Sequence, residues 1–422
     1  MHTTSRDLRP VYHVTPPQGR LNDPNGMYFD GSRLHVYYQH DPGFPDAPKR
    51  TGWGHVSTEI QGPSRLNWQH HPNALYPDVS YDLDGCYSGG AVFHDGRLRL
   101  YYTGNLKRDG IRRATQNLVE VDDPSGLMGG IYRRSALNPL IDGPAEGFTA
   151  HYRDPMISQV DDRWRMVLGA QRAEGTGSVV VYESLDLEHW EFQGELEFDL
   201  EEARLGSAPD LIPDGYMWEC PNLFRLKDEE DGETYDVLIV CPQGLERIDA
   251  ETTHYASSDQ CGYIVGKLEG TKFKVRRGFS ELDFGHEFYA PQVTVANDKT
   301  LLVGWMGLPG QDDHPTVPQE GWVHCLTVPR ELSLKGLALY QDLLLPELEP
   351  GVMRKELGAN SVRIDIRPNI SLEWDGEVLT LDREGDSRVV KAEPGELVIA
   401  DDNTAIEITA GDGQISFALR AF

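Results

Sequence analysis

Five stretches of the chain share one pattern, in which a short apolar strand, a turn rich in Asp and Gly, and a second apolar strand follow one another. The second strands begin 64 to 71 residues apart. Even spacing of this size is typical of a repeat with about four strands per unit. We therefore predict an all-β fold in which residues 1–335 form a five-bladed β-propeller. The stretches are Pro24–Gln39, Ser88–Gly104, Asp154–Ala170, Pro221–Pro242 and Pro291–Gly307.

The pattern changes in the C-terminal part of the chain. From Ser361 onward, seven short alternating strands follow closely on one another, separated by turn signals such as Asp375-Gly376 and Asp412-Gly413. Frequent turns between short strands favour a small β-sandwich. We place it at residues 353–422, after a linker at 336–352. It holds no cluster of candidate catalytic side chains, so we expect its role to be structural.

Charge and cysteine content narrow the range of partners. With 39 basic and 68 acidic residues, the net charge is −29, which disfavours binding to nucleic acid or to an anionic membrane. The five cysteines are scattered and show no CxxC spacing, which argues against a zinc site or a disulfide framework. The N-terminus lacks the apolar core of a signal peptide, and no apolar run is long enough to span a bilayer. We expect a cytoplasmic monomer or homodimer.

Polar residues open the first strand of every repeat. If these strands line a central channel, the polar residues meet at one end of it, and three of them are carboxylates. A proline pushes the residue before it into extended backbone, so we expect Asp23 and Asp154 to be extended. Each short motif alone could be ordinary turn chemistry, but three equivalent carboxylates favour a shared site. The motifs are Asn22-Asp23-Pro24, Tyr87-Ser88, Arg153-Asp154-Pro155, Glu219-Cys220-Pro221 and Tyr289-Ala290-Pro291.

Three carboxylates could bind a metal ion or cleave a glycoside. Calcium or magnesium would suit an oxygen-rich site. However, no local run supplies alternating oxygen ligands, and Arg153 adds positive charge beside Asp154. We therefore expect no metal and no cofactor, and we favour glycoside cleavage, which needs one ionised and one protonated carboxyl group.

The surroundings of each carboxyl group suggest its role. Glu219 lies between Trp218 and Cys220, where apolar neighbours and nearby carboxylate charge would raise its pKa, so it is the better proton donor. Asp23 is then the nucleophile. Asp154, held by the adjacent arginine, would stay ionised and stabilise the cationic ring of the transition state.

A sugar site also needs flat apolar faces and hydrogen-bonding groups. Any one aromatic residue could instead pack between blades. The apolar candidates are Trp53, Tyr87, Phe288, Tyr289 and Trp305, and the polar candidates are Asn22, Gln39, Ser88 and Gln292.

Together these motifs closely resemble glycoside hydrolase family 32, the β-fructofuranosidases, over essentially the whole chain. The resemblance implies a five-bladed propeller with a C-terminal sandwich, and retaining hydrolysis through a covalent fructosyl-enzyme. It also implies that Asp23 is the nucleophile, Glu219 the acid/base and Asp154 the transition-state stabiliser. The fructose-pocket residues would be Leu21, Asn22, Gln39, Trp53, Tyr87, Ser88, Arg153 and Trp305. The motifs include LNDPNG (21–26), YYQHDP (37–42), GWGH (52–55), YSGGAV (87–92), YRDPMI (152–157), WECPNLF (218–224), EFYAPQ (287–292), GWM (304–306) and PRELSL (329–334).

The chain also departs from the family pattern. Arg20-Leu21 stands where the family usually has Trp-Met, a departure that affects the lip of the pocket. We predict sucrose as the substrate. Sucrose 6-phosphate is the main alternative, because Arg20, Lys49 or Arg50 could bind its phosphate; these residues could equally be ordinary surface charges.

The sequence is also compatible with four further functions. Short fructo-oligosaccharides could be hydrolysed, or fructose could be transferred to another sugar. The five-bladed arabinanases and xylosidases, which often invert configuration, are a neighbouring enzyme class. A non-enzymatic, sugar-binding propeller is the most remote.

Overall fold

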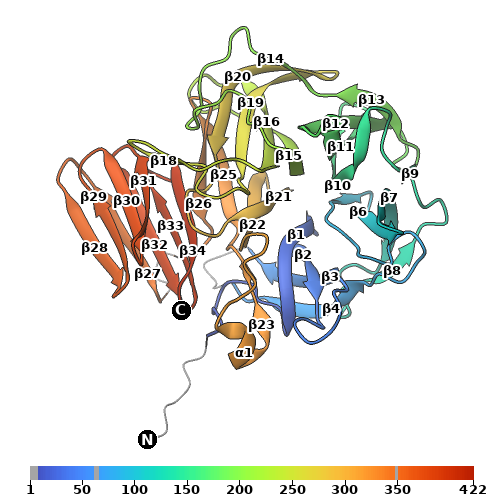
Figure 1. The fold of residues 1–422 in the computed structure, drawn as a ribbon, viewed down its shortest axis with the longest axis horizontal. Helices are drawn as coiled ribbons and strands as arrows, with labels where there is room; N and C mark the ends of the chain where they lie inside the picture. Colours follow the sequence, from blue (N-terminus) through green and yellow to red (C-terminus); the bar gives the residue numbers. More distant parts are fainter. Residues whose placement is uncertain (1–7, 61–65, 347–349) are drawn as a thin grey trace, which may run out of the picture.

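The computed structural model describes residues 8–60, 66–346 and 350–422. Almost all regular structure in these ranges is β-strand, and the helix α1 (Thr316–Glu320) is five residues long. Figure 1 shows a ring of sheets with a separate pair of sheets beside it. The predicted all-β class is confirmed.

Five sheets of four or five strands follow one another along the N-terminal part of the chain. The first contains β1 (Gly19–Phe29), β2 (Arg33–Asp41), β3 (Gly52–Glu59), β4 (Gln69–Leu75) and β23 (Trp322–Val323). The second contains β5 (Ala91–His94), β6 (Arg97–Arg108), β7 (Ile111–Asp122), β8 (Ile131–Arg134) and β9 (Ile141–Asp142). The third contains β10 (Phe148–Val160), β11 (Arg163–Arg172), β12 (Gly177–Ser184) and β13 (Glu191–Glu195).

The remaining two sheets of the ring include strands that join out of sequence order. The fourth contains β14 (Glu197–Asp199), β15 (Met217–Lys227), β16 (Thr234–Gln243), β19 (Gly262–Glu269) and β20 (Lys272–Glu281). The fifth contains β21 (Tyr289–Ala296), β22 (Lys299–Met306), β24 (Cys325–Leu326), β25 (Arg330–Lys335) and β26 (Ala338–Leu343). A small separate ribbon pairs β17 (Ile248–Asp249) with β18 (Thr253–His254).

The first strands of these sheets lie next to one another around a centre. Contacts run from β1 to β5, from β5 to β10, from β10 to β15, from β15 to β21, and from β21 back to β1. In Figure 1, β1, β10, β15 and β21 are the strands nearest the centre. The short strand β23, which follows the β21–β22 hairpin in the sequence, pairs in parallel with β1. A late segment of the chain therefore joins the first sheet. The five polar strand openings therefore come from sheets that meet.

The hairpin turns explain why these stretches fold locally. In the first hairpin, the Asp30 carboxylate accepts hydrogen bonds from the backbone N–H groups of Ser32 and Arg33 at 2.8 and 2.7 Å. Gly31 has a φ of 97°, a conformation that favours glycine. An Asp followed by Gly thus closes the turn between two apolar strands.

The C-terminal part forms two four-stranded sheets. Their facing side chains share one hydrophobic core that includes Trp374, Ile406 and Phe417. One sheet packs on the fifth sheet, because β22 and β26 contact strands β33 and β34. One sheet contains β27 (Val352–Leu357), β32 (Gly395–Asp402), β33 (Ala405–Ala410) and β34 (Ile415–Arg420), and the other β28 (Val362–Arg367), β29 (Ile370–Trp374), β30 (Val378–Arg383) and β31 (Asp386–Lys391).

Two details differ from the sequence-based expectation. The sequence pattern missed β27, whose side chains are mostly exposed and carry no apolar alternation. The segment expected as a linker, residues 336–352, contains β26, which pairs with β25 over six residues. Residues 347–349 of that segment lie outside the described residues.

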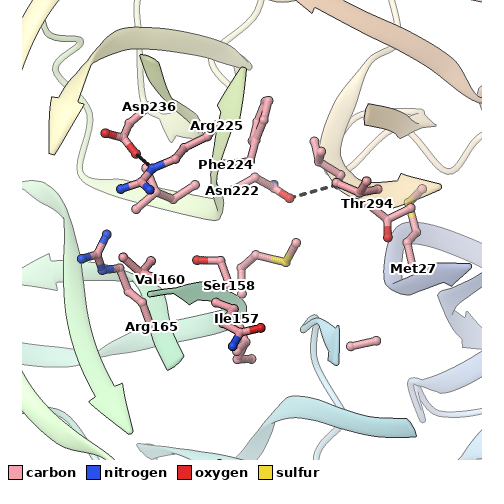
Figure 2. Close-up of a pocket in the computed structure, with 16 residues that line it drawn as sticks. Met27, Ile157, Ser158, Val160, Arg165, Asn222, Phe224, Arg225, Asp236 and Thr294 are labelled. Atoms are coloured by element: carbon pink, nitrogen blue, oxygen red, sulfur yellow. Dashed lines mark hydrogen bonds and ion pairs between the residues drawn. The ribbon is translucent and has the colours of Figure 1, made fainter. Parts of the chain in front are cut away.

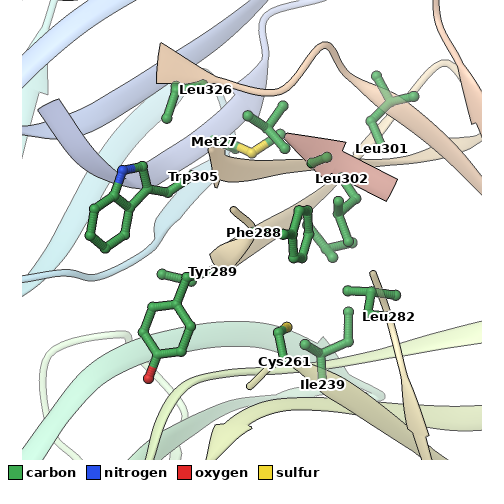
Figure 3. Packing of buried hydrophobic residues seen from close by; sticks show 14 of the residues in the cluster. Met27, Ile239, Cys261, Leu282, Phe288, Tyr289, Leu301, Leu302, Trp305 and Leu326 are labelled. Atoms are coloured by element: carbon green, nitrogen blue, oxygen red, sulfur yellow. The ribbon is translucent and has the colours of Figure 1, made fainter. Parts of the chain in front are cut away.

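A large core cluster links the first, fourth and fifth sheets. Figure 3 shows part of it, with Met27, Ile239 and Leu302 among its members. Tyr289 and Trp305 belong to this cluster and are 2% exposed. The core therefore fixes two aromatic rings at the edge of the channel.

All five cysteines are free thiols, and four of them are buried. No helix in the described part of the chain is long and apolar enough to cross a bilayer.

Candidate active site

A cavity of about 230 Å³ opens where the first strands of the ring begin. It brings together all three predicted catalytic carboxyl groups. Seven of the nine predicted substrate-binding residues also line it. The lining residues are Arg20, Asn22, Asp23, Gln39, Lys49, Tyr87, Ser88, Arg112, Arg153, Asp154, Glu219, Gln243, Tyr289, Trp305 and Pro309.

Asp23 on β1 is held by three side-chain donors. Oδ1 accepts from Asn22 Nδ2 at 2.8 Å, and Oδ2 accepts from Gln39 Nε2 at 3.3 Å and from the Ser88 hydroxyl. Burial raises the pKa of Asp23, the bonds from Ser88 and Asn22 oppose this shift, and the charge of Glu219 adds to it. The donors fix one orientation of the carboxyl group and oppose the effect of burial on its pKa.

Asp154 on β10 does not have the extended backbone that the following proline predicts. Its φ is +65°, and Cys220 and Ala290, which also precede prolines, have φ of +46° and +47°. In each case the strand pairing is irregular at this point. The bulge explains the difference, because it lets Arg153 and Asp154 both reach the cavity although neighbours on a regular strand point to opposite faces. Such left-handed residues cost about 1–3 kcal/mol each.

Arg153 contacts the expected carboxylate of Asp154, but it lies closer to that of Glu219. Its Nη2 and Nε donate to Glu219 Oε1 at 2.6 and 2.9 Å, whereas its Nε is 4.0 Å from Asp154 Oδ2. Glu219 Oε2 accepts a hydrogen bond from the Tyr289 hydroxyl at 2.7 Å. The arginine therefore orients the predicted acid/base more closely than the predicted stabiliser. Burial raises the pKa of Asp154, the charge of Arg153 opposes the shift, and that of Glu219 adds to it.

Cys220 lies between the two aspartates. Its backbone N–H donates to Asp154 Oδ2 at 2.9 Å, and its Sγ is 3.7 Å from Asp154 Oδ2 and 4.0 Å from Asp23 Oδ2. Burial raises the pKa of this thiol well above its usual range, and the neighbouring carboxylates add to the shift. A neutral thiol here can only be a weak donor to the two carboxylates.

Two predicted substrate-binding residues do not line the cavity. Leu21 is fully buried in the core cluster. Trp53 is also fully buried, and its Nε1 donates to the backbone carbonyl of Tyr87 at 3.1 Å, so it supports a lining residue from behind. Arg20 does line the cavity, but its Nε is bonded to Asp312 Oδ1 at 2.8 Å.

Three residues that the sequence did not single out also line the cavity, namely Arg112, Gln243 and Pro309. Tyr289, a candidate aromatic face, and Lys49, a candidate phosphate ligand, do line it. Arg112 and Gln243 come from β7 and β16, whose ends reach the cavity only after folding.

A second, larger cavity of about 390 Å³ lies further along the same strands, toward the ends at which they finish. Figure 2 shows its lining, which includes Met27, Ile157 and Thr294. Its one carboxylate, Asp236, is paired with Arg225 at 3.0 Å. This cavity therefore lacks the groups for acid/base chemistry, and the smaller one has them.

Because the sequence predicts that Asp23 is the nucleophile, replacing Ser88 by Ala should move the acid limb of the kcat/KM profile for sucrose, the predicted substrate, to higher pH. In the intact site the hydrogen bond from Ser88 lowers the pKa of the Asp23 carboxyl group, and the substitution removes this bond. A hydrogen bond to a charged group is worth about 1.5–3 kcal/mol, so we expect a rise of roughly one pKa unit. Measuring kcat/KM against pH for both proteins checks this. An unchanged acid limb would show that another group controls it.

Residues 13–342 match the family described as Glycosyl hydrolases family 32 N-terminal domain. The chain is 40% identical to the sucrose-6-phosphate hydrolase of Bacillus subtilis over 81% of this chain and 66% of that protein. It is 36% identical to the sucrose-6-phosphate hydrolase of Klebsiella pneumoniae over 98% of this chain and 88% of that protein. Among solved structures it is similar to the sucrose-6-phosphate hydrolase of Lactobacillus gasseri, with 28% identity and a TM-score of 0.81. The match covers 99% of this chain and 89% of that one. A Bombyx mori β-fructofuranosidase mutant in complex with sucrose gives 30% identity, a TM-score of 0.77 and coverage of 98% and 89%.

Proposed function

The chain belongs to glycoside hydrolase family 32, and we propose that it hydrolyses the β-fructofuranosyl linkage of sucrose with retention of configuration. The observation that carries the proposal is the cavity in which Asp23, Asp154 and Glu219 meet. Retaining cleavage needs a nucleophilic carboxylate and a second carboxyl group that first gives and then takes a proton.

We assign the steps as the sequence predicts. Asp23 attacks C2 of the fructosyl unit and forms a covalent ester, while Glu219 gives its proton to the departing glucose oxygen. Glu219 then removes a proton from water, which attacks C2 and releases fructose and the Asp23 carboxylate. Asp154 stabilises the positive charge that develops on the ring in both transition states.

The contacts of each group support these roles. The donors around Asp23 hold its carboxylate in one orientation, so that little reorganisation is needed before attack. Arg153 and Tyr289 occupy both oxygens of Glu219 and orient it in the same way.

Reaction with methanol tests both the activity and its stereochemistry. The purified protein should release glucose from sucrose, and with added methanol it should form methyl β-fructofuranoside, identified by NMR. The α-anomer would contradict retention. Absence of glucose release would contradict the proposed activity and favour a sugar-binding role.

Sucrose 6-phosphate is the second candidate substrate, because the cavity carries cationic groups without carboxylate partners. Arg20 is engaged by Asp312 and Arg153 by Glu219. Lys49 and Arg112 line the cavity and form no ion pair with any described residue. On a chain of net charge −29, such a local positive region favours an anionic substrate. The relatives named as sucrose-6-phosphate hydrolases agree with this.

Replacing Lys49 and Arg112 together by Ala should lower kcat/KM for sucrose 6-phosphate about 10- to 100-fold relative to sucrose. Each side chain can give a phosphate a charge-assisted hydrogen bond, and these are stronger than neutral ones. Arg50→Ala is the matched control, because that side chain bonds the Pro77 carbonyl at 3.3 Å and does not line the cavity. If the double variant had the wild-type ratio of kcat/KM for sucrose 6-phosphate to kcat/KM for sucrose, Lys49 and Arg112 would not recognise the phosphate.

We propose that the five N-terminal sheets are the blades of a five-bladed β-propeller. The closed circuit of contacts between their first strands supports this proposal. The predicted boundaries at residues 335 and 353 remain predictions, and the pairing of β26 favours an end of the propeller near Leu343. We also propose a cytoplasmic protein, which the five free thiols support.

A further inference from the structure

Three histidines form a cluster on the first sheet, away from the lining of the active site. His35, His55 and His71 lie on the adjacent strands β2, β3 and β4. Each offers a nitrogen such that the three atoms lie within 4.8 Å of one another. None of them lines the active-site cavity, and nothing in the proposed mechanism uses them.

The hydrogen bonds of His35 fix where its proton lies. Its Nε2 is 3.2 Å from Asp30 Oδ2. An ionised carboxylate only accepts hydrogen bonds, so Nε2 carries the hydrogen. In a neutral ring, Nδ1 is then left with a lone pair.

The same accounting applies to His55. Its Nδ1 is 3.2 Å from the Tyr132 hydroxyl, and that hydroxyl donates its one proton to the carbonyl of Gly129 at 2.7 Å. With its proton on Gly129, the hydroxyl can only accept from its other two neighbours, the Tyr37 hydroxyl at 3.2 Å and His55, and we assign the hydrogen of His55 to Nδ1. Nε2 of His55 is left with a lone pair.

These two lone pairs face each other, because His35 Nδ1 and His55 Nε2 are 3.0 Å apart. Two nitrogen lone pairs at this distance repel each other unless a cation binds to both. His71 adds a third nitrogen: its Nε2 contacts the Ser57 hydroxyl at 2.9 Å, and its buried Nδ1 makes no hydrogen bond of ordinary geometry with a described residue. The backbone of Leu127 is also close enough to this ring to interact with it.

We propose that His35, His55 and His71 bind a divalent transition metal, with zinc as the best fit. Neutral imidazole nitrogens are ordinary zinc ligands, and water would complete a tetrahedral site. The outer nitrogens also have the partners that zinc-bound histidines need, a carboxylate and two hydroxyl groups. This departs from the expectation, drawn from the sequence, that the chain binds no metal.

The fit requires rotation of the His71 ring, because that ring stacks on His55 with the centroids 4.4 Å apart, whereas zinc lies in the plane of each imidazole that binds it. Zinc–nitrogen bonds of about 2.0–2.1 Å in a tetrahedral site separate the nitrogens by roughly 3.4 Å, so the widest pair must approach by rotation of a ring. A backbone loop closes over the cluster at Gly129, where a Cβ atom would lie 2.6 Å from His55 Nδ1. A metal here would tie three strands of the first sheet together, so its role would be structural.

Metal content and stability test the proposal without reference to activity. Untagged protein, stripped with a chelator and dialysed against zinc, should retain about one zinc per chain, and its thermal midpoint should rise by about 5 °C. Cobalt in place of zinc should give the strong visible absorption of a tetrahedral site. His71→Ala should lose all three effects. His70→Ala, on the same strand but exposed, should keep them.

Two results would overturn the proposal. One is wild-type protein that takes up no zinc. The other is zinc bound equally well by His71→Ala and the wild type. The wild-type measurement decides the matter even if His71→Ala does not fold.

Discussion

Replacing Asp23 by Asn should lower kcat for sucrose by about 10⁴-fold or more, which corresponds to at least roughly 5.5 kcal/mol of transition-state stabilisation. The amide has the same size and can still contact Gln39 and Ser88, so the cavity should keep its shape. It cannot form the covalent ester with the fructosyl unit. Initial rates of glucose release measure the loss.

An exposed carboxylate provides the control for this loss. Asp162 lies in the turn of the third hairpin and is exposed, so Asp162→Asn makes the same chemical change far from the cavity lining. It should retain wild-type activity. If Asp23→Asn retained more than about a tenth of wild-type kcat, the covalent route through Asp23 would be wrong.

Replacing Glu219 by Ala separates the acid role from the nucleophile role. Sucrose, with its poor leaving group, should react about 10³-fold more slowly, while a fructoside with a good leaving group should lose far less. Added azide should restore turnover and yield a fructosyl azide, because a small anion can enter the space left by the carboxylate. Asp23→Asn should show neither rescue. Equal behaviour of the two variants would contradict the separate roles.

The main features of the site could be predicted because they depend on local sequence. Hairpins with strong turn signals recur at even spacing, and Asp23, Asp154 and Glu219 occur at equivalent places in them. Once the first strands lie side by side, these groups must share one end. Leu21 and Trp53 show the limit of this reasoning, because a residue within a motif can support the cavity from behind instead of lining it.

The features that were missed depend on tertiary contacts. The preference for extended backbone before proline is a local rule, and at Asp154 the bulge in β10 overrides it. Arg153 does contact its chain neighbour Asp154, but its shorter bonds go to Glu219, and this partner depends on how the third and fourth sheets pack. The three histidines of the cluster lie on three different strands, and their spacing in the sequence does not predict that they meet.

A buried ionic network joins the C-terminal sheets to the ring. Arg330 at the start of β25 donates to Glu407 on β33 at 2.8 Å and to Asp283 at 2.9 Å. His13, before β1, contacts Glu407 at 3.0 Å and Asp402 at 2.8 Å. Arg330 and Glu407 are fully buried. Removing one charge from such a network leaves the others without compensation.

Replacing Glu407 by Gln should therefore destabilise the protein by about 3–5 kcal/mol, measured by denaturant unfolding. Arg330 and His13 would both lose their shared carboxylate. Glu396→Gln is the control: its ion pair with Arg354 is exposed, and such pairs contribute about 1 kcal/mol or less. A loss below about 1 kcal/mol for Glu407→Gln would show that the network contributes no more than a surface pair.

The pH dependence of stability gives this network a second test with a definite sign. Burial would lower the pKa of His13, but its bonds to Asp402 and Glu407 outweigh that and raise the pKa to about 9. A raised folded-state pKa means that the stabilisation is complete below the ordinary value of 6.5 and is lost as the pH rises through 9. Wild-type protein should lose about 3 kcal/mol across this window, at 1.36 kcal/mol per pKa unit. His13→Gln should lose much less over the same range, because its side chain does not titrate. If the two proteins showed the same slope, another group would be responsible, and His13 would not be the charged link between the N-terminal segment and the C-terminal sheets.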